Sequence, residues 1–129
     1  MSLDVKFKKS RINAIVPSKR EGDAGYDLYA AIDSDFLDAH CGIIKNGSFL
    51  PIRAVGDIMT GTEEILVAWR SHEILKIPTG IKTEFDSNYV GILKERGSTG
   101  SKGLAVRSGV IDSSYRGEWF MVIENCTDY

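Results

Sequence analysis

The segment spanning residues 109–119 carries the side chains best suited to chemistry. Asp112 follows two branched apolar residues, Val110 and Ile111, so we expect it at the end of a strand, at the lip of a buried region. A carboxylate held there can polarise a water molecule as a general base. Tyr115, three residues further on, offers a flat ring that could stack on a sugar or a base. The alternative is a tight turn between two strands, where Asp and Ser are common.

A glycine-rich segment, residues 95–104, has the composition of a phosphate-binding loop. Glycines let the backbone approach a ligand closely, so that its amides can donate to phosphate oxygens. Arg96, Lys102 and the neighbouring Ser and Thr hydroxyl groups are suitable partners for the same oxygens. The spacing does not fit a Walker A loop, because Ser101 and not glycine precedes Lys102. A flexible surface loop explains this composition equally well.

A third segment, residues 24–31, places one acidic residue inside an apolar, strand-like run. Asp27 lies there between Tyr26 and Leu28. A functional carboxylate and an outward-facing strand residue are both compatible with this pattern.

The elements that must position these residues are short strands. Leu3, Val5 and Phe7 alternate with polar residues, a period of two that buries one face of a sheet. Asn46 and Gly47 stand between apolar runs and predict a two-residue hairpin turn, since both positions of that turn need a positive φ.

Further strands are expected at residues 74–77, 81–85, 88–94 and 119–123, and an exposed loop at residues 17–23. Residues 63–70 contain good helix formers, but their continuous apolar run favours a strand. Many short strands separated by turn residues indicate an all-β sandwich, jelly roll or barrel.

Composition narrows the class of protein. The chain has 129 residues, of which 43% are hydrophobic, so a single globular domain over residues 1–129 is expected. The formal charge is -2, from 16 Lys and Arg against 18 Asp and Glu, and this balance argues against binding nucleic acid through bulk electrostatics. We find neither a membrane-spanning stretch nor a signal peptide in the sequence, so we expect a cytoplasmic protein.

The two cysteines, Cys41 and Cys126, lie far apart and are expected to be reduced, half-buried thiols. His40 beside Cys41 could form half of a metal site, but no second pair stands at a useful spacing. We therefore favour thiols without a metal.

Together and in this order, the three segments resemble the motifs of the trimeric deoxyuridine triphosphate nucleotidohydrolases (dUTPases). Residues 24–28 are similar to the family's Ala-Gly-x-Asp-Leu pattern, and residues 96–104 to its Arg-Ser-Ser-x-x-x-Lys-Gly-Leu pattern. Residues 109–118 are similar to Gly-Val-Ile-Asp-x-x-Tyr-Arg-Gly-Glu, the most specific of the three. Residues 77–81 also resemble the strand and turn that precede the second motif, so the resemblance covers most of residues 24–32 and 74–125.

The resemblance implies an activity, an architecture and an assembly. The family cleaves dUTP to dUMP and pyrophosphate, with Mg²⁺ bound to the phosphates. Its fold is a distorted jelly-roll β-barrel, and a homotrimer builds three active sites at its subunit interfaces. This chain is therefore expected to bind dUTP with Mg²⁺ as a homotrimer, to require no nucleic acid and no membrane, and to resemble the phage or viral members.

The resemblance also assigns roles to single residues. Asp112 would activate the water that attacks the α-phosphorus, and Tyr115 would stack on the deoxyribose. Backbone groups of residues 104–111, among them Gly109 and Ile111, would hold uracil in a hairpin. Asp27 would act on Mg²⁺ through water or support the neighbouring subunit's second motif. Contacts to the phosphates would come from Arg96, Gly97 and Ser98.

Three departures from the family's pattern stand out. Gly97 occupies the position of a Ser whose hydroxyl contacts the phosphates. Residues 36–71 are longer than the usual connection, which predicts an added hairpin or loop. Neither the fourth motif nor the glycine-rich fifth motif is visible, so we expect the natural chain to be longer.

Two other functional hypotheses remain. A non-catalytic nucleotide-binding or regulatory protein could keep this fold, and Gly97 together with the two motifs that are not visible favours it. A dCTP deaminase shares the fold, but the run Tyr115-Arg116-Gly117 favours the dUTPase branch.

Overall fold

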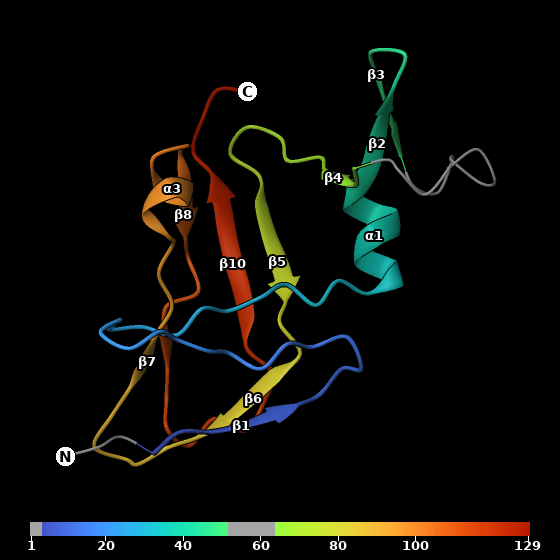
Figure 1. Cartoon of the computed structure of the whole chain (residues 1–129). Coiled ribbons are helices and arrows are strands. Elements are labelled where there is room, and N and C mark those ends of the chain that lie inside the picture. Colours follow the sequence, from blue (N-terminus) through green and yellow to red (C-terminus); the bar gives the residue numbers. More distant parts are fainter. Residues whose placement is uncertain (1–3, 52–63) are drawn as a thin grey trace.

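The computed structural model describes residues 4–51 and 64–129, and these form a mostly β structure with short helices (Figure 1). In chain order the elements are β1 (Lys6–Lys9), α1 (Ser34–His40), β2 (Cys41–Lys45), β3 (Ser48–Pro51), β4 (Leu66–Val67), β5 (Ile74–Pro78), β6 (Ile81–Glu84), β7 (Gly91–Ile92), α3 (Gly97–Gly100), β8 (Leu104–Val106), β9 (Val110–Ile111) and β10 (Phe120–Asn125).

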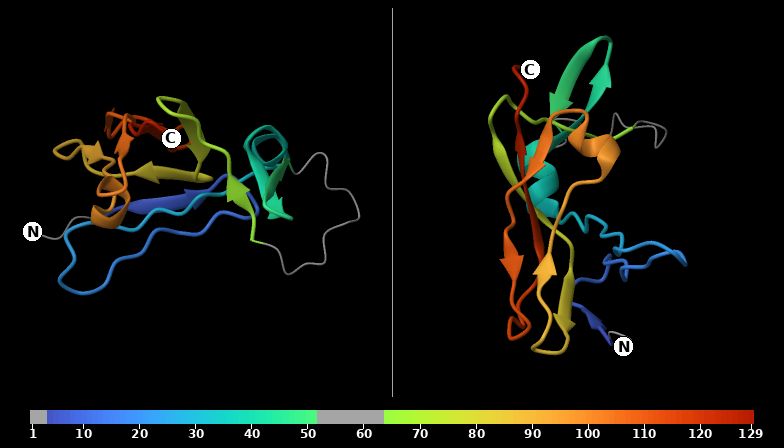
Figure 2. Two further views of the ribbon diagram at one scale, coloured as in Figure 1. Left: turned by 90° about the horizontal axis from the view of Figure 1, so that it is seen from above. Right: turned by 90° about the vertical axis from the view of Figure 1, so that its left-hand side faces the viewer.

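The strands form four small antiparallel sheets. One three-stranded sheet has the order β5-β10-β8, and a second three-stranded sheet has the order β3-β2-β4. Two further pairs, β1 with β6 and β7 with β9, complete the described strands. Figure 1 shows α1 and the β2–β3 hairpin beside β5, and Figure 2 shows residues 11–32 forming an extended arm. The arm projects in its middle and returns to the end of β5, where the Ala31 amide donates to the Pro78 carbonyl at 2.7 Å.

Strand β10 divides the side chains of its sheet between two faces. Its register sets Met121 opposite Ile77 and Val122 opposite Lys76. Because successive side chains of a strand point to opposite faces, Met121 and Ile77 share one face, and Val122 and Lys76 share the other. The face with Ile77 packs against a core cluster of Phe36, Cys41 and Leu75, to which Trp69 also adds.

Several sequence-based expectations are confirmed. Asn46 and Gly47 have φ values of 53° and 79° and join β2 to β3 as the predicted hairpin. The strands expected near residues 74–77, 81–85 and 119–123 are β5, β6 and β10, and the ambiguous segment 63–70 contains β4. The strand expected over 88–94 is only two residues long, β7. Leu3 and residue 63 lie outside the described residues.

The helix α1 departs from the all-β expectation. Asp33 caps its first turn, where the Oδ1 atom accepts a hydrogen bond of 2.8 Å from the Phe36 amide. Phe36 is 7% exposed and packs with Cys41 and Leu75. A seven-residue helix is marginal by itself, so the burial of its apolar side against β5 stabilises it here.

The thiols also differ from the expectation. Both cysteines are free, but Cys41 is 1% exposed and Cys126 is exposed, so neither is half-buried. Burial raises the pKa of the Cys41 thiol, which keeps it protonated and unreactive near neutral pH.

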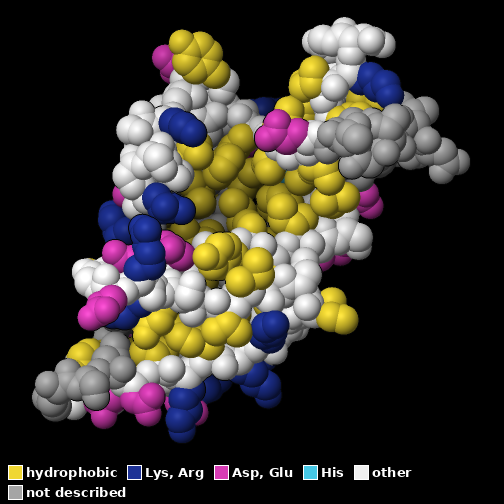
Figure 3. Space-filling view, viewed as in Figure 1, with side chains coloured by type: hydrophobic (Ala, Val, Ile, Leu, Met, Phe, Trp, Pro, Cys, Tyr) yellow, Lys and Arg dark blue, Asp and Glu magenta, His cyan; other side chains and the backbone are white. Residues whose placement is uncertain are grey.

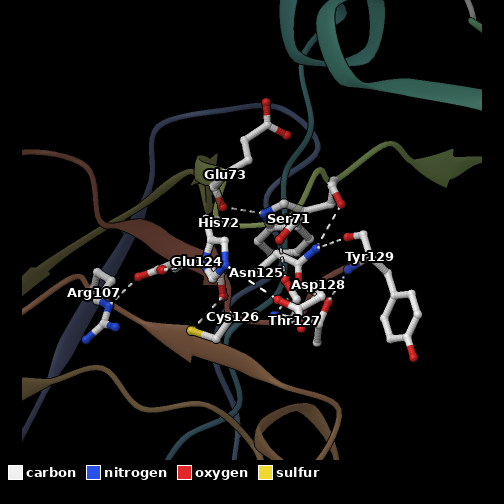
Figure 4. Close-up of polar contacts among 11 residues, drawn as sticks. Ser71, His72, Glu73, Arg107, Glu124, Asn125, Cys126, Thr127, Asp128 and Tyr129 are labelled. Carbon is white, nitrogen blue, oxygen red and sulfur yellow. Dashed lines mark hydrogen bonds and ion pairs between the residues drawn. The ribbon is translucent and has the colours of Figure 1, made fainter.

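Asn125, the last residue of β10, holds the end of the described chain in place (Figure 4). Its Nδ2 atom donates to the carbonyl oxygens of Trp69 at 2.9 Å and Tyr129 at 3.0 Å. Its Oδ1 atom accepts from the Thr127 amide at 3.0 Å and from the Thr127 hydroxyl at 2.6 Å. Because Asn125 is only 6% exposed, these four hydrogen bonds compensate for burying its amide.

One surface of the structure is apolar and hollowed. Figure 3 shows hydrophobic side chains gathered over β5 and β10, between α3 and the β2–β3 hairpin. Within the described ranges, every helix is too short and too polar to traverse a lipid bilayer.

The turn between β5 and β6 tests the packing of the arm on the sheet. Gly80 has a φ of 66°, and an added Cβ would lie 2.7 Å from the Cβ of Ala14. We expect Gly80→Ala to lower the free energy of unfolding by about 2–4 kcal/mol, because it combines a left-handed backbone with overpacking. Urea denaturation measures this loss.

Gly25→Ala is the matched control. A Cβ at Gly25 would meet nothing within 4 Å, so the expected change is below about 0.5 kcal/mol. Equal losses in the two variants would contradict the packing described for Gly80.

Candidate active site

A hollow of about 270 Å³ opens where β9, β10 and β5 meet. The side chains around it come from three strands, from the connection before β9 and from the turn after it: Lys76, Ser108, Val110, Ile111, Asp112, Tyr115, Phe120 and Val122. The walls are mainly apolar, while one carboxylate and one ammonium group face the same space. Such a space, apolar with few polar groups, is typical of a small-molecule site.

Asp112 stands at the end of β9, where the sequence predicts it. The two residues of β9 pair with Ile92 and Gly91, and the chain turns directly after them. Among the described residues, the Asp112 carboxylate has neither an ion pair nor a hydrogen-bond partner, and it is exposed to the hollow. Its oxygens are therefore available to accept hydrogen bonds from water or a ligand.

The Tyr115 ring lines the same hollow, and hydrogen bonds hold both its backbone amide and its hydroxyl group. Its amide donates to the Asp112 carbonyl at 3.0 Å, which closes a turn, and its hydroxyl donates to the Glu118 carbonyl at 3.0 Å. A side chain at Gly117 would overlap the Tyr115 ring, so glycine makes room for it there. The short turn thus holds a carboxylate and an aromatic ring in one hollow.

An ion-pair cluster, formed by Arg11, Asp33 and Glu118, anchors this turn to the start of the chain. The Arg11 Nε atom lies 2.8 Å from Glu118 Oε1, and its Nη1 atom lies 2.8 Å from Asp33 Oδ2. The hydrogen bond that Arg11 donates to Glu118 raises the pKa of Arg11. The Phe36 amide and then Arg11 lower the pKa of Asp33.

Sequence reasoning missed Arg11 as a contributor, because 107 residues separate it from Glu118 and no local pattern links them. The other oxygen of that carboxylate, Glu118 Oε2, is buried without a hydrogen-bond partner among the described residues. Glu118 is therefore held from one side only.

Gly109 and Ile111 were predicted to belong to a hairpin over residues 104–111, and this hairpin is not formed. Strand β8 pairs with β10, whereas β9 pairs with β7. Gly109 has a φ of 73° and lies between two residues that line the hollow, and Ile111 lines it directly. Both residues are close to Asp112 in the chain, as expected: Ile111 ends β9, and Gly109 directly precedes that strand.

The second predicted segment lies elsewhere. Arg96, Gly97 and Ser98 are exposed, and residues 97–100 form one helical turn, α3, instead of a flexible loop. None of the three lines the hollow that contains Asp112. The segment contacts β8 through Glu95, whose Oε2 atom accepts a hydrogen bond of 2.9 Å from the Val106 amide.

Asp27 is likewise outside the hollow. It lies on the exposed arm, where its amide donates to the Ser18 carbonyl at 2.8 Å and forms an isolated bridge instead of a strand. The parts of the chain that the structure describes hold no group of three or more His, Cys, Asp or Glu placed for a metal. His40 packs its ring against Phe36, at 4.8 Å between centroids.

The described chain has the fold of the dUTPases. The chain is similar to the dUTPase of Staphylococcus bacteriophage 80alpha, with a TM-score of 0.66 and 22% identity, over 97% of this chain and 61% of that one. A dUTPase variant from phage phi11 of S. aureus gives a TM-score of 0.65 and 21% identity, over 98% and 62% of the two chains.

The similar structures include ligands, and they are longer. The phi11 structure concerns the coordination of a structural Mg(II) ion. A variant of the 80alpha dUTPase contains dUpNHpp and matches with a TM-score of 0.66 and 21% identity, over 97% of this chain and 61% of that one. The chain thus spans about three fifths of the length of the structures it matches. No protein-family model matches it.

Glu95 provides a test of how the second segment is held. The hydrogen bond from the Val106 amide lowers the pKa of Glu95 below its ordinary value of 4.5. The contact therefore stabilises the segment above that value, and the stabilisation is lost as the pH falls through the lowered pKa. In NMR spectra, the Val106 amide proton should titrate with a midpoint below 4.5.

Glu95→Gln should abolish this titration, while Glu21→Gln, a change in the exposed arm, should leave it unchanged. A Val106 amide that titrates identically in Glu95→Gln would disprove the contact.

Proposed function

We propose that the chain hydrolyses dUTP to dUMP and pyrophosphate. The observation that supports this most is the joint placement of Asp112 and Tyr115 around one hollow of about 270 Å³. This is the pair of groups that the third dUTPase motif would supply, and the chain shares the fold of phage dUTPases. We therefore assign it to the nucleotidohydrolases as a phage-type dUTPase with a jelly-roll barrel.

The hollow would receive the nucleoside. The Tyr115 ring would stack on the deoxyribose, and a ribose 2′-hydroxyl would collide with it. Backbone groups at Gly109 and Ile111 would pair with the Watson–Crick edge of uracil. Cytosine would set donors against donors there, and unpaired buried polar groups are costly.

Asp112 would act on a water molecule. Its carboxylate has no competing partner among the described residues, so it can accept a proton from water aligned with the α-phosphorus. The water oxygen forms the new bond to phosphorus, the bond to the bridging oxygen breaks, and pyrophosphate leaves. General-base assistance of this kind contributes about 10²–10⁴-fold to the rate.

Mg²⁺ would arrive as part of the substrate, bound to the phosphates. The described residues do not form a protein cage for it, and Mg²⁺ commonly keeps several waters while binding phosphates. Asp27 is the carboxylate that we propose to reach this ion through water. No step of the reaction depends on that contact here.

The phosphates would be bound by a second subunit of a homotrimer. Arg96, Gly97 and Ser98 lie outside the hollow of their own chain, so their contribution would come from a neighbouring copy. The apolar hollow in Figure 3 is also of a kind that is usually covered in an assembly. Closed symmetry then gives three equivalent shared sites.

The catalytic role of Asp112 can be tested by one substitution. Asp112→Asn should lower the release of pyrophosphate from dUTP by at least about 100-fold, because the amide cannot act as the base. Binding of dUpNHpp should change little, because the substitution preserves the shape of the side chain.

Asp86→Asn is the matched control, an Asp on a loop that lines no part of this hollow, and it should keep full activity. Equal activity of Asp112→Asn and the wild type would overturn the proposed role. Binding of dUpNHpp by a wild-type chain that never turns over dUTP would favour a regulatory protein, and ammonia release from dCTP would favour a deaminase.

Shared sites predict complementation between inactive variants. Asp112→Asn and Arg96→Ala should each be inactive alone. Mixed, dissociated and reassembled in equal amounts, they should recover about a quarter of the wild-type activity, because a quarter of the interfaces combine both intact residues. No recovery in confirmed mixed trimers would place both residues in one chain's site.

A further inference from the structure

A second hollow, of about 260 Å³, lies between β1, β6 and the turn after Asp112. Its charged lining consists of four cationic side chains, Lys6, Lys8, Lys82 and Arg116, and one acidic side chain, Glu84. The whole chain carries a net charge of -2, so this concentration of positive charge does not follow from composition.

The register of the strands gathers the lysines on one face. Lys8 lies directly opposite Lys82, and Lys6 lies two residues along from Lys8, opposite Glu84. Side chains directly opposite in an antiparallel pair share a face, and like charges in that position destabilise the pair. Within the described residues, no carboxylate oxygen comes within 4.0 Å of Lys6, Lys8 or Lys82.

Some hydrogen-bond donors of Arg116 hold its side chain in place, and others have no partner among the described residues. Its Nη1 atom donates to the carbonyl oxygens of Ser113 at 2.5 Å and, more weakly, Thr83 at 3.5 Å. The Nε and Nη2 atoms have no hydrogen-bond partner among the described residues. An arginine held in this way can still present two donors to an oxyanion, the geometry that phosphate groups favour.

We propose that this hollow, formed by Lys6, Lys8, Lys82 and Arg116, binds a polyphosphate chain. The lysines stand about 5 Å apart across the strands and about 7 Å apart along β1, a spacing that suits several phosphate groups better than one. A bound polyanion would also relieve the repulsion between Lys8 and Lys82. The inference is independent of the hydrolytic function, since none of these residues lines the hollow of Asp112.

Calorimetric titration with inorganic triphosphate tests the proposal. The double variant Lys8→Gln, Lys82→Gln should bind triphosphate at least about fivefold more weakly than the wild type, because two exposed charge contacts are lost. Lys9→Gln should bind as the wild type does, since Lys9 lies on the same strand but does not line the hollow. Weakening of the same size in Lys9→Gln, or none in the double variant, would overturn the proposal.

Three further measurements identify the ligand and locate its binding site. Amide NMR shifts on titration should change most at Lys8 and Lys82, and changes confined to residues around Asp112 would contradict the site. If a nucleoside triphosphate also shifts these same amides, a nucleotide is identified as the source of the polyphosphate chain. If only inorganic triphosphate shifts them, the free anion is identified. An oligonucleotide that binds more tightly than triphosphate would overturn the assignment in favour of nucleic acid.

Hydrolysis of dUTP by the double variant separates the two proposals. Its rate should equal that of the wild type, because the substituted lysines lie outside the catalytic hollow. An inactive wild type would refute the hydrolytic function and leave the triphosphate measurement valid.

Discussion

Strand β10 pairs with β5 along one edge and with β8 along the other, and its alternating side chains serve two surfaces at once. Ile123, opposite Leu75, belongs to the face that packs on the buried side of α1. Phe120 and Val122 belong to the other face and form walls of the hollow that contains Asp112. A register shift of one residue would exchange these two sets of side chains, so the core and the candidate active site depend on the same pairing. The strand pairing that stabilises the fold therefore also fixes the shape of the site.

The Asp112 turn gains its rigidity from contacts that are distant in sequence. Arg11 joins Glu118 to Asp33, and Asp33 in turn caps α1 through the Phe36 amide. The start of the chain, the helix and the turn are thus linked through one guanidinium group. Acidification weakens this link from the carboxylate side: the pKa of Asp33 is lowered, so its stabilising contribution is present above the ordinary value and is lost as the pH falls through the lowered one. A rigid turn matters because a general base works only if its carboxylate stays aligned with the reacting atoms.

The sequence allowed the local features to be predicted, because their causes are local. The Asn46–Gly47 turn follows from the need for positive φ, and the position of Asp112 after a strand follows from the two apolar residues before it. The helix α1 was missed because its stability comes from packing Phe36 against β5, far along the chain. The hairpin expected over residues 104–111 failed because pairing partners are chosen by the whole sheet: β8 pairs with β10 instead of β9. The Arg11–Glu118 pair and the separation of Arg96 from the hollow likewise depend on tertiary structure alone.

In the proposed reaction, Asp112 directs water at the α-phosphorus of a nucleotide in the hollow it shares with Tyr115. Hydrolysis of dUTP in water labelled with heavy oxygen, followed by mass spectrometry of both products, tests this most directly. Attack at the α-phosphorus predicts the label in dUMP and unlabelled pyrophosphate. Label in the pyrophosphate would mean that water attacks a different phosphorus, and it would contradict the assigned position of the carboxylate.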